Sequence, residues 1–296
     1  MSQSLQHPTK KAWFKWPIIL LSSVSGIYFA LCLYLLFWQT RILFNPYKTV
    51  EKLPATYALT STELFLPVNK NESLHGWWLP ATTSTEKVLL FLHGNSSNVG
   101  GNLFHAKRFV DLGFSVLLMD YRGFGQSDGS FPHENQVYED AQVMYDYLVK
   151  TRNIAPENIF VYGHSMGGAI AIELVTNNPV SGLITEGTFT SIADMASYTG
   201  KYSFLPINLL LHQRFESLTK IKTIQTPTLF IHGTEDELVP VAMGEALHAE
   251  STAPKQLLIV PGAGHSDVAS TAEETYDTAI LDFSEFVQLR QAKAIF

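Results

Sequence analysis

The sequence has little charge and almost no cysteine. Only 16% of its 296 residues are charged, whereas an average soluble domain has about 25%. The single cysteine, Cys32, lies in an apolar run near the N-terminus, so the rest of the chain has no thiol. A disulfide framework, a cysteine nucleophile and a thiolate metal site are therefore excluded beyond that run. Because 46% of the residues are hydrophobic, the chain also lies outside the disordered class.

The charge that is present is unevenly distributed. The first 52 residues carry a net charge of +5, and the remainder carries −12. An acidic domain repels a phosphate backbone, so nucleic acid is not expected as a partner. The basic N-terminal part lies where an anionic membrane surface would attract it.

Residues 17–38 form an uncharged apolar run flanked by Trp13, Trp16 and Trp38. Its length matches the ~30 Å hydrocarbon core of a bilayer at ~1.5 Å rise per residue, and tryptophan is typical of the interface. A cleavable signal peptide is the alternative, but its apolar region spans only ~7–15 residues and a small-residue cleavage site follows it. We therefore expect an uncleaved transmembrane helix at 17–38, after a short basic tail at 1–16, with the bilayer as partner.

The charges around this run indicate an orientation. Lys10, Lys11 and Lys15 precede it in a very short tail, while Arg41 and other basic residues follow it. The positive-inside rule then favours a cytoplasmic N-terminus and an extracytoplasmic domain, periplasmic if the chain is bacterial.

After a connector at 39–60, apolar β-rich runs alternate with amphipathic helical stretches. This alternation predicts an α/β domain at 61–296 with a mostly parallel sheet. The predicted strands are 64–68, 74–79, 88–92, 115–119, 158–162, 182–185, 228–231 and 256–260. The first two have no helix between them, which indicates an antiparallel hairpin at the sheet edge.

The predicted helices are 102–112, 136–150, 166–176, 241–249 and 273–288. The alternation is interrupted at about 187–226, where the sequence shows no clear strand. An insertion at this point of an α/β sheet would lie over the carboxyl ends of the strands, where ligands bind. We expect a small cap there.

The segment Gly163-His164-Ser165-Met166-Gly167 joins a predicted strand to a predicted helix. A G-x-S-x-G motif at such a junction holds its serine in a strained turn with the hydroxyl exposed, and the flanking glycines avoid clashes. Ser165 is therefore the candidate nucleophile. A neutral hydroxyl needs a histidine base, and that histidine needs a carboxylate to fix its tautomer.

Two later strand ends supply these partners. Asp236 follows the strand at 228–231, and His265 follows the strand at 256–260. The order Ser165, Asp236, His265 is that of the α/β-hydrolase topology. The competing carboxylates are Glu235, Glu237 and Asp267. Of these, Asp267 is too near His265 in sequence to orient it comfortably.

The oxyanion of an acyl-transfer intermediate also needs donors. The turn His93-Gly94-Asn95 ends the strand at 88–92 and could direct backbone N–H groups at that charge. The expected pair is the N–H of Asn95 and the N–H of Met166. His93 and His164 are interpreted as residues that stabilise their turns. The other histidines lack the spacing of metal ligands, so neither a metal nor a cofactor is expected.

With these residues and the run Asp120-Tyr121-Arg122-Gly123-Phe124-Gly125-Gln126-Ser127, the chain resembles the α/β-hydrolase superfamily. It is most similar to the branch of single-span, membrane-anchored serine hydrolases of ABHD type. The resemblance covers about residues 60–290. It implies an eight-stranded sheet with helices on both faces and the nucleophile after the fifth strand. It also implies that Arg122 and Ser127 are structural and that Ser165 excludes the dehalogenase and epoxide hydrolase chemistries, which use aspartate.

Membership of this superfamily does not identify the substrate. The expected activity is hydrolysis of a carboxylic ester or thioester, and the apolar stretch at 189–215 suggests a lipophilic acyl group, although the same stretch could simply pack on the sheet. An acyltransferase, a serine peptidase and a membrane-tethered binding protein without catalysis remain alternatives, and the oligomeric state is left open.

Overall fold

The computed structural model describes residues 15–83 and 85–294. Its eight strands form one sheet in the order β1-β2-β4-β3-β5-β6-β7-β8. The strands are β1 (Thr62–Pro67), β2 (Ser73–Leu79), β3 (Val88–Leu92), β4 (Ser115–Met119), β5 (Ile159–His164), β6 (Gly182–Glu186), β7 (Thr228–Gly233) and β8 (Lys255–Val260). The two pairings of β2, with β1 and with β4, are antiparallel and the other pairings are parallel. The predicted sheet and its edge hairpin are confirmed.

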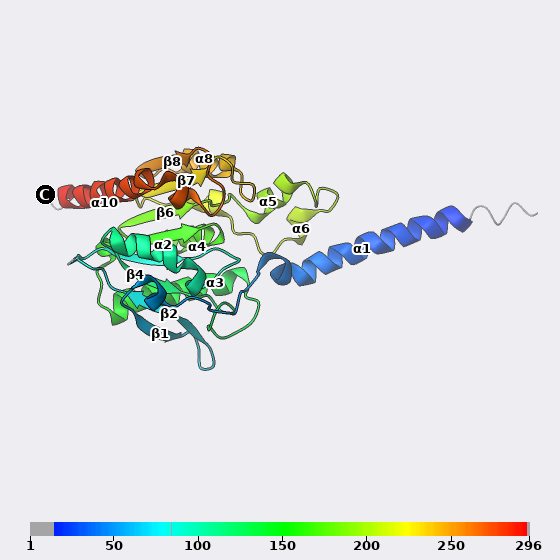
Figure 1. Ribbon diagram of the computed structural model, residues 1–296. Coiled ribbons are helices and arrows are strands. Elements are labelled where there is room, and N and C mark those ends of the chain that lie inside the picture. The colour runs from blue at the N-terminus through cyan, green and yellow to red at the C-terminus, as the bar shows by residue number, and fades with distance from the viewer. Residues whose placement is uncertain (1–14, 84, 295–296) are drawn as a thin grey trace, which may run out of the picture.

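Helices cover both faces of the sheet (Figure 1). The α-helices of the described residues are α1 (Lys15–Leu43), α2 (Val99–Asp111), α3 (Glu134–Asp146), α4 (Met166–Asn177), α5 (Ile192–Thr199), α6 (Ile207–Leu210), α7 (Ser217–Ile221), α8 (Val241–Glu250), α9 (Val268–Ala272) and α10 (Glu274–Ala294). Helices α3, α4, α7 and α8 share one hydrophobic core, and α2, α9 and α10 share the other.

The strands separate these two cores because their side chains alternate between the faces. Leu90 and Leu92 of β3 belong to the core under α3 and α4, whereas Leu89 and Phe91 belong to the core under α2 and α10. All four are buried. Burial on both sides explains why the central strands are continuous apolar runs.

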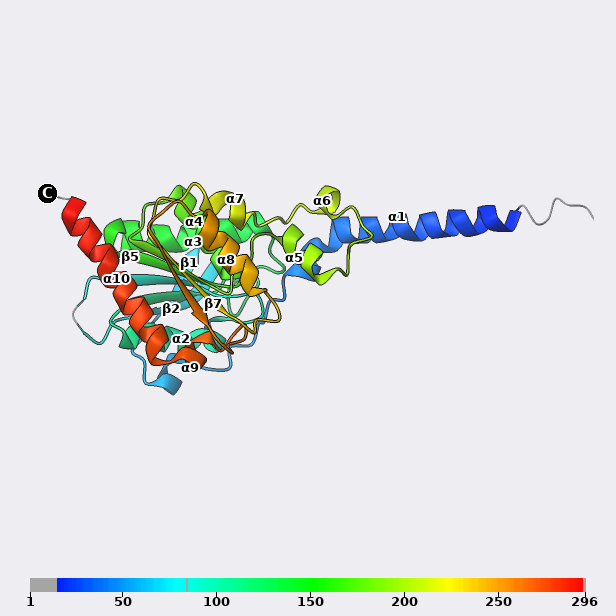
Figure 2. The same ribbon diagram turned by 90° about the horizontal axis from the view of Figure 1, so that it is seen from above.

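Helix α1 projects from the body of the molecule as a long rod (Figures 1 and 2). It has 29 residues and is the one helix among the described residues that is long and apolar enough to cross a membrane. It continues to Leu43, five residues beyond the apolar run. Helices α5 and α6 lie beside its C-terminal part (Figure 2).

Candidate active site

Ser165 lies in the turn between β5 and α4. Its backbone has φ 55° and ψ −119°, a strained conformation for a residue with a side chain. The turn is tightly enclosed: a methyl group on Gly163 would collide with the Gly167 carbonyl, and one on Gly167 would collide with the Leu92 carbonyl. Close packing therefore requires the glycines of the motif. Ser165 lies between them, directly after the carboxyl end of β5.

Asp236 and His265 come from the loops after β7 and β8 and meet beside this turn. His265 Nδ1 donates to Asp236 Oδ2 at 2.7 Å. The other carboxylate oxygen accepts the backbone N–H of Leu238 at 3.0 Å and that of Val239 at 2.8 Å. The structure thus pairs His265 with Asp236, while Asp267 accepts the N–H of Gly264 instead.

The charge of Asp236 is stabilised where it lies. Burial raises the pKa of its carboxyl, but hydrogen bonds from His232, His265 and Val239 outweigh burial and hold that pKa well below its usual value. An ionised carboxylate keeps the proton of His265 on Nδ1, so Nε2 is free to accept a proton. His164 supports the same loop, because its Nε2 donates to the His265 carbonyl at 2.9 Å. Burial lowers the pKa of His164.

A cavity of about 640 Å³ connects the predicted site residues. Ser165, His265, Asn95 and Met166 all line it. Within the described part of the chain, no hydrogen bond joins Ser165 Oγ to His265, a common situation without substrate because such contacts tighten in the complex. Met166 is the first residue of α4, so its N–H has no partner within the helix and is available to an anion.

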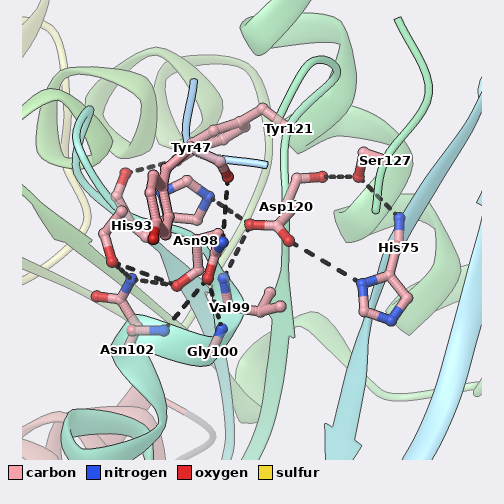
Figure 3. A network of polar contacts seen from close by, with 12 residues as sticks. Tyr47, His75, His93, Asn98, Val99, Gly100, Asn102, Asp120, Tyr121 and Ser127 are labelled. Carbon is pink, nitrogen blue, oxygen red and sulfur yellow. Dashed lines mark hydrogen bonds and ion pairs between the residues drawn. The ribbon is translucent and has the colours of Figure 1, made fainter. Parts of the chain in front are cut away.

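A buried polar network contacts His93, which belongs to the same turn as Asn95 (Figure 3). Asp120 lies between His93, whose Nε2 is 3.2 Å from its Oδ1, and His75, whose Nδ1 is 4.0 Å from its Oδ2. Tyr121 Oη donates to the His93 carbonyl at 3.1 Å. His93 is therefore placed to support the turn, as the sequence indicates.

Asp120 also fixes the start of α2, because its Oδ1 accepts the N–H of Val99 at 2.9 Å. Ser127 Oγ donates to the Asp120 carbonyl at 2.8 Å. Arg122 pairs with Asp140, its Nε lying 2.7 Å from Oδ1. Both residues of the Asp120–Ser127 run that were expected to be structural thus make contacts within the fold.

Sequence reasoning missed Glu186, the last residue of β6. This side chain is 2% exposed yet lines the cavity. Its Oε2 accepts hydrogen bonds from Tyr162 at 3.0 Å and from Tyr276 at 2.7 Å. Nearby His105 has its pKa lowered to about 4 by burial, so it is neutral at pH 7. The sequence does place Glu186 at the end of an apolar strand next to the strand that carries Ser165. This position is the one feature that could have marked Glu186 as a residue near the site.

The insertion at 187–226 forms α5, α6 and α7 with their connecting loops. Phe189 and Phe215 are buried and line the cavity, whereas Phe204 and Leu209 are exposed. The insertion therefore both packs on the body and leaves apolar side chains uncovered.

Known proteins resemble the chain over most of its length. A family described as serine aminopeptidase, S33, matches residues 83–218. The uncharacterized protein Rv2307c of Mycobacterium tuberculosis is 30% identical over 77% of this chain and 81% of its own. Lysophosphatidylserine lipase ABHD12 of Danio rerio is 31% identical over 61% of this chain and 51% of its own.

Among solved structures, the esterase Pf2001 of Pyrococcus furiosus superposes with a TM-score of 0.68 at 21% identity and covers 81% of this chain and 98% of its own. At this identity the similarity establishes the fold. Together with the match to the serine aminopeptidase family and the similarity to ABHD12, this fold shows that the chain belongs to the α/β-hydrolase superfamily.

Proposed function

We propose that the protein is a membrane-anchored serine hydrolase that cleaves carboxylic esters or thioesters. The observation that carries this proposal is the 2.7 Å hydrogen bond between His265 Nδ1 and Asp236 Oδ2, in a cavity that Ser165 also lines. A serine in a strained turn with a carboxylate-oriented histidine beside it is the arrangement that acyl transfer needs.

In the proposed reaction, Ser165 Oγ attacks the carbonyl carbon while His265 Nε2 takes its proton. The negative charge on the carbonyl oxygen is stabilised by the N–H groups of Asn95 and Met166. His265 then gives the proton to the leaving alcohol or thiol, which leaves an acyl group on Ser165. A water molecule then attacks the acyl carbon while His265 takes its proton, and His265 returns this proton to Ser165 Oγ as the carbon–oxygen bond to the serine breaks and the acid leaves. Asp236 holds His265 in the required tautomer throughout.

The lining of the cavity supports a lipophilic acyl group. Phe189, Ile192, Met195 and Phe215 contribute apolar side chains to it. The relative named as a lysophosphatidylserine lipase agrees with ester chemistry on such a substrate. An acyltransferase and a serine peptidase would use the same residues and remain alternatives, and the matching family is itself described as a serine aminopeptidase.

The anchor in this proposal is the apolar run 17–38, which connector 39–60 joins to a hydrolase domain at 61–296 with its cap at 187–226. Apolar side chains along the run are exposed in the structure, Leu21 and Phe37 among them. A single helix with so much uncovered apolar surface is typical of a membrane span.

A fluorophosphonate probe tests the catalytic part of the proposal. The full-length protein in detergent should be labelled, and Ser165→Ala should lose both labelling and turnover of p-nitrophenyl esters. Its thermal unfolding should stay close to that of the unchanged protein. Retained turnover in Ser165→Ala would reject the assignment, and absent labelling of folded protein would favour a binding role. A preference for palmitate over butyrate would support the lipophilic substrate.

A further inference from the structure

The last turn of α1 is fixed to the hydrolase domain by a buried amide. Gln39 is 3% exposed, in a helix whose other described residues are not buried. Its Nε2 donates to the Leu210 carbonyl at 2.6 Å, and its Oε1 accepts the N–H groups of His212 at 3.0 Å and Gln213 at 3.3 Å. Because a buried amide is costly unless its polar atoms are paired, this position joins the helix to the end of α6 and to the segment that follows it.

A second contact joins α1 to the turn beside the nucleophile. Asn95 Nδ2 donates to the Leu43 carbonyl, one of the C-terminal carbonyls that a helix leaves without a partner, and Asn95 Oδ1 accepts the N–H of Asn45 at 3.0 Å. Phe44, between these two residues, is 1% exposed and its ring lies 6.1 Å from that of Phe215. The side chain of the residue proposed to stabilise the oxyanion therefore binds the end of α1.

The same turn of α1 also lines the cavity. Ile42 and Leu43 contribute to its wall together with Met195 and Ala196 of α5. Leu209, at the end of α6, is 85% exposed, and Figure 2 shows α6 alongside α1. The apolar part of the cavity thus lies between the last turn of the apolar helix and the cap.

We propose that the last turn of α1 and residues 43–45 are part of the active site: they hold the Asn95 turn in place, and they form the wall along which a lipid acyl chain passes from the bilayer to Ser165. This inference rests on the proposed hydrolase function. In this role α1 positions the oxyanion donor and selects the acyl chain, in addition to anchoring the protein. Asn95 acts through its side chain as a positioning residue and through its N–H on the substrate.

The wall is tested with full-length protein in phospholipid nanodiscs. Ile42→Trp should narrow the cavity. Ile27→Trp is the matched control, because it makes the same substitution nearer the N-terminus of α1, at a residue that does not line the cavity. We expect Ile42→Trp to lower the ratio of kcat/KM for p-nitrophenyl palmitate to that for p-nitrophenyl butyrate by about tenfold, because pocket contacts of this size discriminate chains by ~10–200-fold. Ile27→Trp should keep the ratio of the unchanged protein. Equal ratios in the two variants would overturn the proposal.

The positioning contact is tested with Asn95→Ala, and Lys48→Ala serves as the control. Lys48 belongs to the segment that follows α1 and contacts the domain away from the Asn95 turn: its Nζ donates to the carbonyls of Ser127 at 3.0 Å and Gly129 at 3.3 Å. For Asn95→Ala we expect kcat for both esters to fall about 10–100-fold at nearly unchanged KM, because a donor displaced by ~1 Å costs about that much. Lys48→Ala should keep kcat. A parallel loss in the two variants, or no loss in Asn95→Ala, would overturn the positioning role.

These outcomes are separate from those that test the proposed function. If the unchanged protein neither reacts with the fluorophosphonate nor hydrolyses either ester, the proposed function fails and this inference fails with it. If the unchanged protein is active, Ser165→Ala is inactive, and Ile42→Trp and Asn95→Ala match their controls, then the function stands and the inference alone is rejected.

Discussion

At the scale of single residues, buried histidines contribute stability that depends on pH. His75 is fully buried, with Glu63 Oε1 2.9 Å from its Nε2 and Asp120 Oδ2 4.0 Å from its Nδ1. Burial lowers the pKa of His75, but the two carboxylates outweigh burial and leave that pKa above its ordinary value of 6.5. A charged His75 is thus better accommodated in the folded protein than in the unfolded chain.

The sign of the effect follows from linkage. A raised folded-state pKa contributes stability that is fully present below pH 6.5 and is lost as the pH rises through the folded-state pKa. His75→Gln removes this contribution. We therefore expect the variant's melting temperature to lie further below that of the unchanged protein at about pH 6 than at about pH 8, because the charged form of histidine prevails only at the lower pH. Thermal unfolding at both pH values measures this, and an equal difference at both would contradict it.

The site residues differ in how far sequence could predict them. Ser165 is a candidate because its glycines encode a local turn, and Asp236 and His265 are candidates because each follows a strand in a known order. The structure brings Asp236 and His265 together, and the catalytic roles of all three stay a prediction. Glu186 was not singled out, since nothing near it in the sequence marks its tyrosine partners. The side-chain contact of Asn95 with Leu43 joins residues 52 positions apart, so no local pattern indicates it.

At the scale of elements, the nucleophile turn depends on how closely α4 approaches β3. Gly167→Ala would push a methyl group into the carbonyl of Leu92. We expect it to destabilise the fold by about 1–3 kcal/mol, the usual cost of overpacking, and to lower turnover because Ser165 moves with the helix. Gly26→Ala is the matched control, since a methyl group there meets no atom within 4 Å. Chemical denaturation of both variants measures the difference, and equal stabilities would refute the packing argument.

The strands and most helices follow from periodicity, but their ends do not. The predicted helix 136–150 is divided in the structure between α3, which ends at Asp146, and a π-helical turn at Tyr147–Thr151. The predicted helix 273–288 continues to Ala294. Helix α1 continues past its apolar run, where Gln39 is paired with Leu210 at the end of α6 and with His212 beyond it. Such ends are set by tertiary contacts, which local propensity does not describe.

The short helices of the cap were not predicted individually. Helix α6 has four residues and α7 has five, too few for a helical period to show. Hydrogen bonds between residues distant in sequence join the segments of the cap: the N–H of Leu218 in α7 donates to the Thr190 carbonyl at 3.0 Å, and the N–H of Ile192 in α5 donates to the Arg214 carbonyl at 3.0 Å. The sequence showed where the insertion lies and that it is apolar, and packing determined its shape.

At the scale of the whole molecule, we expect the charges around α1 to set the membrane side of the hydrolase domain. The cations that follow the apolar run are engaged by the domain: Arg41 lies 5.0 Å from the centre of the Phe131 ring, and Lys48 donates to two carbonyls. Residues that fold with a large domain are translocated with it largely regardless of charge. We therefore expect the three lysines before the run to decide the orientation.

We accordingly expect the N-terminus to be cytoplasmic and the hydrolase domain to be extracytoplasmic. A reporter that is active only outside the cytoplasm, fused after Phe296, should be active, and the same reporter fused before Met1 should be inactive. Replacing Lys10, Lys11 and Lys15 with glutamine should reduce the activity of the C-terminal fusion, because the orienting charge is then lost. An inactive C-terminal fusion together with an active N-terminal fusion would contradict this prediction and indicate the opposite orientation. In that case the lipid substrate would come from the cytoplasmic leaflet.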